Sequence, residues 1–392
     1  MAYTLTTILL AVLLCVSAVK PYSDNSHDGI CKYMVETQGY VCEEHQVTTK
    51  DGYILGMQRI LVGRSNKTAD RPPVLLQHGI LTDATTWLLN SPDESLAFIL
   101  ADNGFDVWLA NTRGTIASRG HTSLSTNDPA YWDWTWVQLF TYDLSALYEY
   151  VHDQTGQKQY YVGHSLGTLE AFVSFSKEKL LNMTKSAALL APIAYIGQMS
   201  SLFARAMVTT SLSERMYQLG LYEFIAGGQD VGKLLESICH LPLIDCNSLL
   251  TVIGGPNCCI NPSAIAVFFD HFPQSTSTKN FVHLAQMVRK GNIAMYDYIN
   301  ESENMEHYRK PTPPLYNMTR IPNGIPLFVS YGGKDMLSDV NDVQLLLDYL
   351  KDHKKDKLVV QYTEDYAHFD FCLAENANRV VYDPLMAFFG AT

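Results

Sequence analysis

The residues best suited to chemistry in this sequence are residues 163–167, which read Gly-His-Ser-Leu-Gly. An apolar, strand-like run at residues 159–162 precedes them, and a helix-like stretch follows. A serine at such a strand-to-helix turn is held in a strained conformation with its hydroxyl exposed, and Gly163 and Gly167 leave room for the turn. The pattern predicts that Ser165 is a nucleophile beside a helix N-terminus, where developing negative charge is favoured.

A serine hydroxyl needs a base to remove its proton and an acid to hold that base. Asp335 directly follows a predicted strand at residues 327–331, and His368 follows another at residues 358–362. Serine hydrolases with a parallel sheet carry their acid and histidine in this order, after late strands. We therefore predict the catalytic triad Ser165, Asp335 and His368. The rival residues fit their strands less well: the acids Asp339 and Asp365 and the base His353.

Acyl transfer also needs hydrogen-bond donors for the oxyanion of the tetrahedral intermediate. One predicted donor is the amide of Leu166, directly after the nucleophile. The other is the amide of Ile80, in the loop after a short apolar strand at residues 74–77. Two histidines, His78 and His164, lie next to these segments, and we interpret both as structural.

The elements that must position these residues alternate between strands and helices. A hairpin is predicted around Asp51-Gly52, and the tryptophan-rich residues 132–136 are interpreted as packing residues. This alternation predicts a mostly parallel, doubly wound sheet of the α/β class. The other predicted strands are residues 74–77, 105–110, 159–162, 187–190, 327–331 and 358–362, and the predicted helices are residues 95–101, 142–152, 339–351 and 380–389.

Residues from about 195 to 308 break this alternation with helix-like apolar segments, clustered cysteines and turn-rich stretches. Because they begin shortly after the strand that follows Ser165, we interpret them as a helical cap or lid over the site; a separate domain is the alternative. The predicted organisation is a signal peptide (1–18), the first part of the core (19–194), the cap (195–308) and the second part of the core (309–392).

Charge and hydropathy indicate the class of partner and the compartment. The chain has 28 basic and 40 acidic residues, a net charge of −12, which disfavours nucleic acid as a partner. Residues 5–16 are apolar and precede small residues, but a membrane span needs about 20 residues. They predict a secretory signal peptide, with a buried N-terminal strand as the alternative, and no later run is long enough to span a membrane. We expect a secreted, vacuolar or lysosomal protein.

Cysteines and sequons agree with export. Of the 8 cysteines, Cys15 lies in the predicted signal, which leaves an odd number. A zinc site at residues 239–259 is disfavoured because the spacing of its cysteines and His240 matches no finger or ribbon. The disulfide candidates, whose connectivity spacing does not fix, are Cys31, Cys42, Cys239 and Cys246, and the candidate glycosylation sites are Asn66, Asn182, Asn300 and Asn317.

Five segments carry a further signal: residues 77–81, 105–114, 161–165, 332–335 and 368–370. They resemble the acid lipases, the family of gastric and lysosomal acid lipase and their plant and insect relatives. The similarity runs from about residue 30 to residue 389, and residues 246–261, with the pair Cys258-Cys259, look most like the plant triacylglycerol lipases of this family. One departure is Leu166, because several members carry Gln after the serine.

The resemblance implies an α/β-hydrolase fold with an inserted cap, cleavage of carboxylic esters of lipids, and no metal or organic cofactor. It also implies catalytic roles for Ser165, Asp335 and His368. We therefore predict a secreted lipase that hydrolyses triacylglycerols through an acyl-enzyme, with a lipid ester substrate at an oil–water or membrane interface. The alternatives are a sterol esterase or general carboxylesterase, an acyltransferase, and a catalytically idle protein that binds a hydrophobic ligand. The sequence makes no prediction of oligomeric state.

Overall fold

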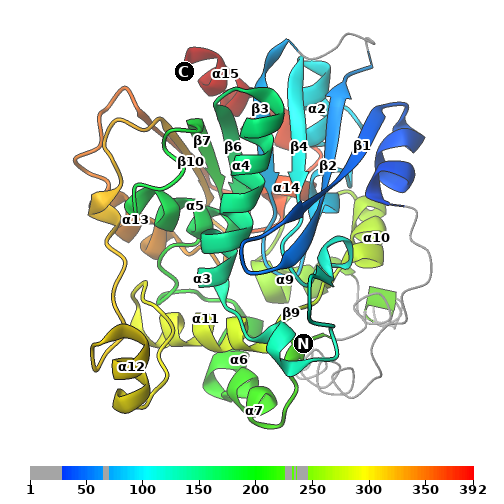
Figure 1. Cartoon of the computed structure of the whole chain (residues 1–392). Coiled ribbons are helices and arrows are strands. Elements are labelled where there is room, and N and C mark those ends of the chain that lie inside the picture. Colours follow the sequence, from blue (N-terminus) through cyan, green and yellow to red (C-terminus); the bar gives the residue numbers. More distant parts are fainter. Residues whose placement is uncertain (1–28, 65–69, 226–231, 234, 236–245) are drawn as a thin grey trace.

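The computed structural model describes residues 29–64, 70–225, 232–233, 235 and 246–392 (Figure 1). The predicted signal peptide, the sequon at Asn66, and Cys239 lie outside the described residues. Within the described part of the chain, no helix is long and apolar enough to cross a membrane.

A nine-stranded sheet forms the centre of the molecule, in the order β1-β2-β4-β3-β6-β7-β10-β11, with β5 beside β2. All pairs from β4 to β11 along this order are parallel, whereas β1, β2 and β5 join by antiparallel pairing. This confirms the mostly parallel sheet. The strands are β1 (Val41–Thr48), β2 (Tyr53–Val62), β3 (Arg71–Gln77), β4 (Phe105–Ala110), β5 (Gly120–His121), β6 (Gln159–His164), β7 (Thr184–Leu190), β10 (Leu327–Gly332) and β11 (Leu358–Thr363), with β8 (Glu223–Phe224) and β9 (Thr276–Ser277) pairing separately.

Helices connect most of these strands. The α-helices described are α2 (Leu96–Asp102), α3 (Trp136–Gln138), α4 (Leu144–Thr155), α5 (Leu166–Ser176), α6 (Leu202–Thr209), α7 (Leu212–Gln218), α9 (Cys246–Gly254), α10 (Pro262–His271), α11 (Thr278–Lys290), α12 (Glu301–Tyr308), α13 (Val340–Tyr349), α14 (Asp370–Leu373) and α15 (Asp383–Ala391). Short 3₁₀ or π turns are η1 (Cys31–Val35), η2 (Glu36–Gln38), η3 (Ala84–Trp87), η4 (Ile116–Ser118), η5 (Pro129–Trp132), η6 (Leu139–Asp143), η7 (Met318–Arg320) and η8 (Asn378–Tyr382).

The core lies in two layers, one on each face of the sheet. Successive residues of a strand point to opposite faces. Val74 and Leu76 of β3 accordingly pack with α2 and α15, while Leu75 packs with α4 and α5. Helices therefore cover both faces, as the alternation of strands and helices predicted (Figure 1).

The predicted hairpin and all the predicted strands are present. β1 and β2 pair across the turn at Asp51-Gly52, where Gly52 has a φ of 99° that only glycine adopts readily. The prediction was wrong at the starts of two helices. Residues 139–143 form the π turn η6 before α4, so the regular helix begins at Leu144 and not at residue 142. Residues 378–382 likewise form the π turn η8, so α15 begins at Asp383 and not at residue 380.

Residues 195–308 separate β7 from β10 along the chain and contain α6, α7, α9, α10, α11 and α12. These helices gather at one end of the sheet, below it in Figure 1. The small sheet of β8 and β9 also belongs to this insertion. The tryptophans at 132, 134 and 136 are buried against the neighbouring core, in agreement with their interpretation as packing residues.

Candidate active site

Ser165 lies in a sharp turn between β6 and α5. Its φ and ψ are 54° and −120°, a conformation that side chains rarely adopt and that surrounding structure must enforce. A Cβ at Gly163 would lie 2.8 Å from the Tyr161 ring, and a Cβ at Gly167 would lie 2.9 Å from the Gln77 carbonyl oxygen. Both glycines are therefore needed for the close packing of this turn.

The structure brings Ser165, Asp335 and His368 together. Nε2 of His368 lies 2.8 Å from Oγ of Ser165, and Nδ1 lies 2.8 Å from Oδ2 of Asp335. The three residues follow β6, β10 and β11, and the carboxyl ends of parallel strands meet at one edge of a sheet. The topology thus joins residues that are far apart in the sequence.

Asp335 is fixed so that one of its oxygens faces the imidazole. Oδ1 accepts hydrogen bonds from the amides of Leu337 (2.8 Å) and Ser338 (2.7 Å), which leaves Oδ2 for His368. Ser165, Asp335 and His368 are 3%, 4% and 2% exposed. In this dry site, the carboxylate can hold one imidazole tautomer and stabilise the imidazolium.

The rival acids and base lie elsewhere. Asp339 caps α13 by accepting a hydrogen bond from the Asn341 amide, and Asp365 is exposed. His353 bonds through Nε2 to the Ile325 carbonyl. These contacts account for the rival residues without any role at Ser165.

The two predicted oxyanion residues flank Ser165. Leu166 is the first residue of α5, where an amide has no acceptor within the helix. The loop that carries Ile80 passes so close that a Cβ on Gly79 would lie 2.8 Å from Cβ of Ser165. Ile80 and Leu166 both line the pocket that contains Ser165.

The neighbouring histidines support these loops. His78 is in hydrogen-bond contact with the Gly79 carbonyl through Nδ1 (2.7 Å) and accepts the Thr112 amide through Nε2 (3.1 Å). Nε2 of His164 lies 3.0 Å from the His368 carbonyl, a contact that sequence reasoning missed. Burial, reinforced by the nearby His368, lowers the pKa of His164 to about 3, so His164 is a neutral donor to the His368 backbone.

A pocket opens above Ser165 and His368 and, together with the open solvent at its mouth, encloses about 970 Å³. Its walls are mostly apolar and come largely from the insertion between β7 and β10, so they can contact an apolar group beside the serine. The insertion residues with large apolar side chains in these walls include Met199, Phe203, Met207, Phe272, Phe281 and Leu284.

The cysteines form two disulfides in the described part of the chain, Cys31–Cys42 and the adjacent pair Cys258–Cys259, and Cys372 is a buried free thiol. Cys31 and Cys42 are two of the predicted disulfide candidates, whereas the bond between Cys258 and Cys259 was not predicted. The zinc interpretation of residues 239–259 loses two of its ligands, because oxidised cysteines offer no thiolate. Among the described residues, no cluster of three or more His, Cys, Asp or Glu could hold a metal ion.

Three of the predicted glycosylation sites are described. Asn182, Asn300 and Asn317 are exposed, which is the location that a glycan requires. Asn300 lies at the N-cap of α12, and Asn317 caps η7.

Sequence comparisons assign the family. The chain is 48% identical over 376 residues to "Triacylglycerol lipase 2" of Arabidopsis thaliana, covering 95% of this chain and 90% of that protein. It is 36% identical over 368 residues to "Gastric triacylglycerol lipase" of Homo sapiens, covering 90% and 89%. A family model described as "Partial alpha/beta-hydrolase lipase region" matches residues 31–91, and one described as "alpha/beta hydrolase fold" matches residues 72–203. The chain belongs to the acid lipase family. This acid lipase is therefore an ester hydrolase of the serine type.

Solved structures agree on the fold. A soluble variant of monoglyceride lipase from Saccharomyces cerevisiae superposes with a TM-score of 0.55 at 14% identity, covering 96% of this chain and 99% of that one. A thermostable carboxyl esterase from Bacillus coagulans also gives 0.55 at 14% identity, covering 89% and 98%. The acid lipase thus has the α/β-hydrolase fold that the sequence resemblance implied.

Proposed function

We propose that this acid lipase hydrolyses long-chain acylglycerols, with triacylglycerol as the expected substrate. The observation that carries the proposal is the mostly apolar lining of the pocket at Ser165, which suits fatty acyl chains. The relatives named as triacylglycerol lipases, at 48% and 36% identity, support the same substrate class. The insertion at residues 195–308 would act as the cap that shields the acyl chain from water.

The proposed reaction follows from the hydrogen bonds at Ser165. His368 removes the hydroxyl proton through Nε2 as Oγ attacks the ester carbonyl, and Asp335 stabilises the resulting imidazolium through Nδ1. The amides of Ile80 and Leu166 bind the oxyanion. His368 then returns the proton to the leaving alcohol, and water cleaves the acyl-enzyme on Ser165 by the same route in reverse.

We also propose that the protein enters the secretory pathway. The disulfides Cys31–Cys42 and Cys258–Cys259 fit an oxidising compartment. The exposed sequon residues Asn182, Asn300 and Asn317 fit glycosylation on that route.

The test compares hydrolysis of an emulsified long-chain triacylglycerol with that of a soluble short-chain ester. Ser165→Ala is expected to lower kcat about a thousandfold or more on both substrates. Ser174→Ala is the matched control, because Ser174 is buried on the same helix α5 and lies outside the pocket lining. Wild-type activity on the soluble ester alone would make the protein an esterase. Folded wild-type protein with no activity on either substrate, from acidic to weakly alkaline pH, would favour the idle binding protein.

A further inference from the structure

Residues 254–260, which join α9 to α10, contact both loops that carry the proposed acid and base. The Gly254 carbonyl accepts hydrogen bonds from the amides of Met336 (3.1 Å) and His368 (3.2 Å). A Cβ on Gly254 would lie 2.7 Å from the Phe369 ring and 3.0 Å from Cβ of His368. The insertion therefore reaches the two loops through its backbone, and not only through the walls of the pocket.

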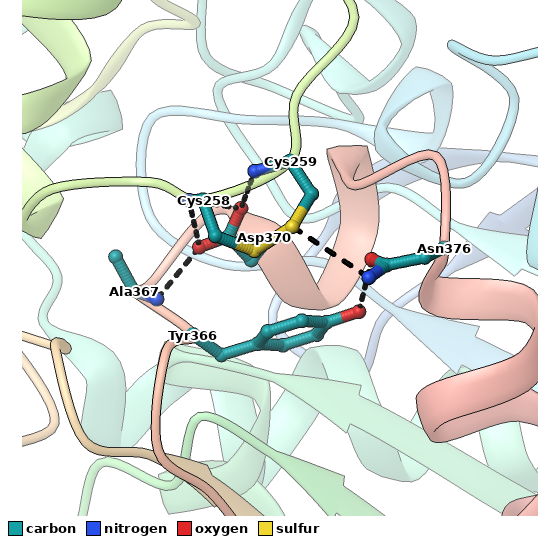
Figure 2. The surroundings of a disulfide bond; sticks show 6 residues. All are labelled: Cys258, Cys259, Tyr366, Ala367, Asp370 and Asn376. Atoms are coloured by element: carbon teal, nitrogen blue, oxygen red, sulfur yellow. Dashed lines mark hydrogen bonds between the residues drawn. A yellow bond between two sulfur atoms is a disulfide. The ribbon is translucent and has the colours of Figure 1, made fainter.

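The same segment contains the disulfide between the neighbours Cys258 and Cys259 (Figure 2). In an extended chain, successive side chains and successive amides point to opposite sides. The bond between adjacent sulfurs holds both side chains on one side of the backbone, so residues 258 and 259 depart from this alternation. In this arrangement both amides point to the carboxylate of Asp370, Cys258 at 3.2 Å from each oxygen and Cys259 at 3.5 Å from Oδ1.

Asp370 uses this carboxylate to hold the loop of His368. Oδ2 also accepts the amide of Ala367 at 2.7 Å, so the side chain two residues after His368 bonds to the residue directly before it. Asp370 is fully buried, and burial raises its pKa to about 6 against the opposing effect of the three amides. The three amide hydrogen bonds offset the free-energy cost of removing the carboxylate from water. Without these donors, that cost would not be offset.

Further contacts hold Cys259 against the segment that follows His368 (Figure 2). Its carbonyl accepts the amide of Glu375 at 2.9 Å, and its sulfur lies 3.6 Å from Nδ2 of Asn376. Asn376 in turn accepts the hydroxyl of Tyr366 at 2.7 Å through Oδ1. The disulfide is thus joined to the His368 loop on both sides of Asp370.

We propose that the Cys258–Cys259 disulfide and Asp370 are positioning residues that hold His368 at hydrogen-bond distance from Ser165 and Asp335. The disulfide turns two amides onto Asp370, and Asp370 fixes the backbone on either side of His368. The inference rests on the proposed function for the role of the triad. It adds that the insertion fixes the position of His368, the proposed catalytic base.

The first experiment compares the double variant Cys258→Ser/Cys259→Ser with Cys31→Ser/Cys42→Ser, which removes the second disulfide of the described residues, at the β1 edge of the sheet. On a soluble ester, the first variant is expected to lose about tenfold in kcat with KM within about twofold of wild type, because small displacements of a catalytic group mainly slow the chemical step. Labelling of Ser165 by a fluorophosphonate should slow in parallel. The control variant should keep both rates.

Substitution of Asp370 tests the link between the disulfide and His368. Asp370→Asn keeps an acceptor oxygen and Asp370→Ala does not, so the Asn variant should retain more of kcat. Equal losses in the two variants, or normal labelling in folded Cys258→Ser/Cys259→Ser protein, would contradict the proposal.

Chemical reduction of the wild-type protein covers the case in which the double variant does not fold. A dithiol reagent passes two electrons and two protons to the disulfide, which becomes two thiols while the reagent becomes a cyclic disulfide. Cys258 is exposed and Cys31 is only 4% exposed, so the Cys258–Cys259 pair should react first, as alkylation and peptide mass spectrometry will show. The loss of kcat should accompany this reaction and reverse on reoxidation.

A measurement without substrate separates this proposal from the proposed function. The downfield proton resonance of the hydrogen bond between His368 and Asp335 should shift or broaden when Cys258–Cys259 is removed and should persist in Cys31→Ser/Cys42→Ser. If the resonance responds while even the wild type hydrolyses no ester, the positioning holds and the proposed function fails. An unchanged resonance in the double variant would overturn the positioning, whatever the activity.

Discussion

Some residues contact Ser165 so closely that there is little space for a larger side chain at their positions. Gly79 belongs to the loop of the proposed oxyanion donor Ile80, and an added Cβ would lie 2.8 Å from Cβ and 3.2 Å from Oγ of Ser165. Contacts this short force one of the two backbones to move. Either movement would displace the Ile80 amide or the serine hydroxyl from its place in the proposed reaction.

Gly79→Ala should therefore lower kcat about a hundredfold on a short-chain ester, close to the cost of losing one oxyanion donor. The measurement is steady-state kinetics together with a thermal unfolding scan. Gly324→Ala is the control, because the nearest atom to its added Cβ is 3.9 Å away at the end of the Lys354 side chain. Full activity in Gly79→Ala would show that the loop at Ile80 takes no part in the reaction.

Elements of the insertion line the pocket at Ser165 and, under the proposed function, should limit which substrates fit. Helix α6 presents Phe203, Ala204 and Met207 to the pocket, while Arg205 and Thr209 are exposed on its other side. This division follows from the helical period, which puts residues three and four apart on one face. The size of the side chains on the inner face of α6 should therefore limit the length of the acyl chain.

Ala204→Trp should lower hydrolysis of a long-chain ester about tenfold or more relative to a short-chain ester, because one methylene in an apolar pocket already discriminates about tenfold. Ratios of kcat/KM for esters of increasing chain length provide the measurement. Thr209→Trp adds the same side chain to the exposed face of α6 and should leave the ratios unchanged. Equal effects of the two variants on all chain lengths would argue against α6 as a wall of the substrate site.

At the level of the whole molecule, buried imidazoles that remain neutral make the free energy of unfolding depend on pH. Burial lowers the pKa of both His164 and His283 to about 3. The unfolded chain takes up these protons below pH ~6.5, so stability is lost as the pH falls from there toward 3. The pKa of Asp370 is raised to about 6 and has the opposite effect. The contribution of Asp370 to the free energy of unfolding is lost as the pH rises from about 4 to 6.

His283→Gln tests this balance at a residue of α11 that does not line the pocket. His283 bonds to the Ala294 carbonyl through Nε2, a contact that a glutamine amide can replace. Between pH 6 and pH 4, the free energy of unfolding of the variant should fall less steeply than that of wild type, by about 1.4 kcal/mol per pH unit. Denaturant unfolding at several pH values gives the slope. The control, His307→Gln, makes the same substitution at an exposed imidazole.

The sequence by itself determined the features that depend on neighbours along the chain. The turn at residues 163–167, the strands and the places of Asp335 and His368 after β10 and β11 follow from side-chain period and turn chemistry, which act over a few residues. The same local reasoning placed the start of α4 too early, because the π turn η6 has the helical pattern without regular helical hydrogen bonds.

Only the tertiary structure decided which distant residues meet. The amides of Cys258 and Cys259 bond to Asp370 across 112 and 111 residues of chain, and the insertion supplies much of the pocket wall at Ser165. The partner of a cysteine, the donors to a buried carboxylate and the shape of a cavity depend on contacts between elements that no local pattern encodes. The sequence therefore predicted candidate residues for the chemistry, and the packing of the insertion on the sheet decided what surrounds and holds them.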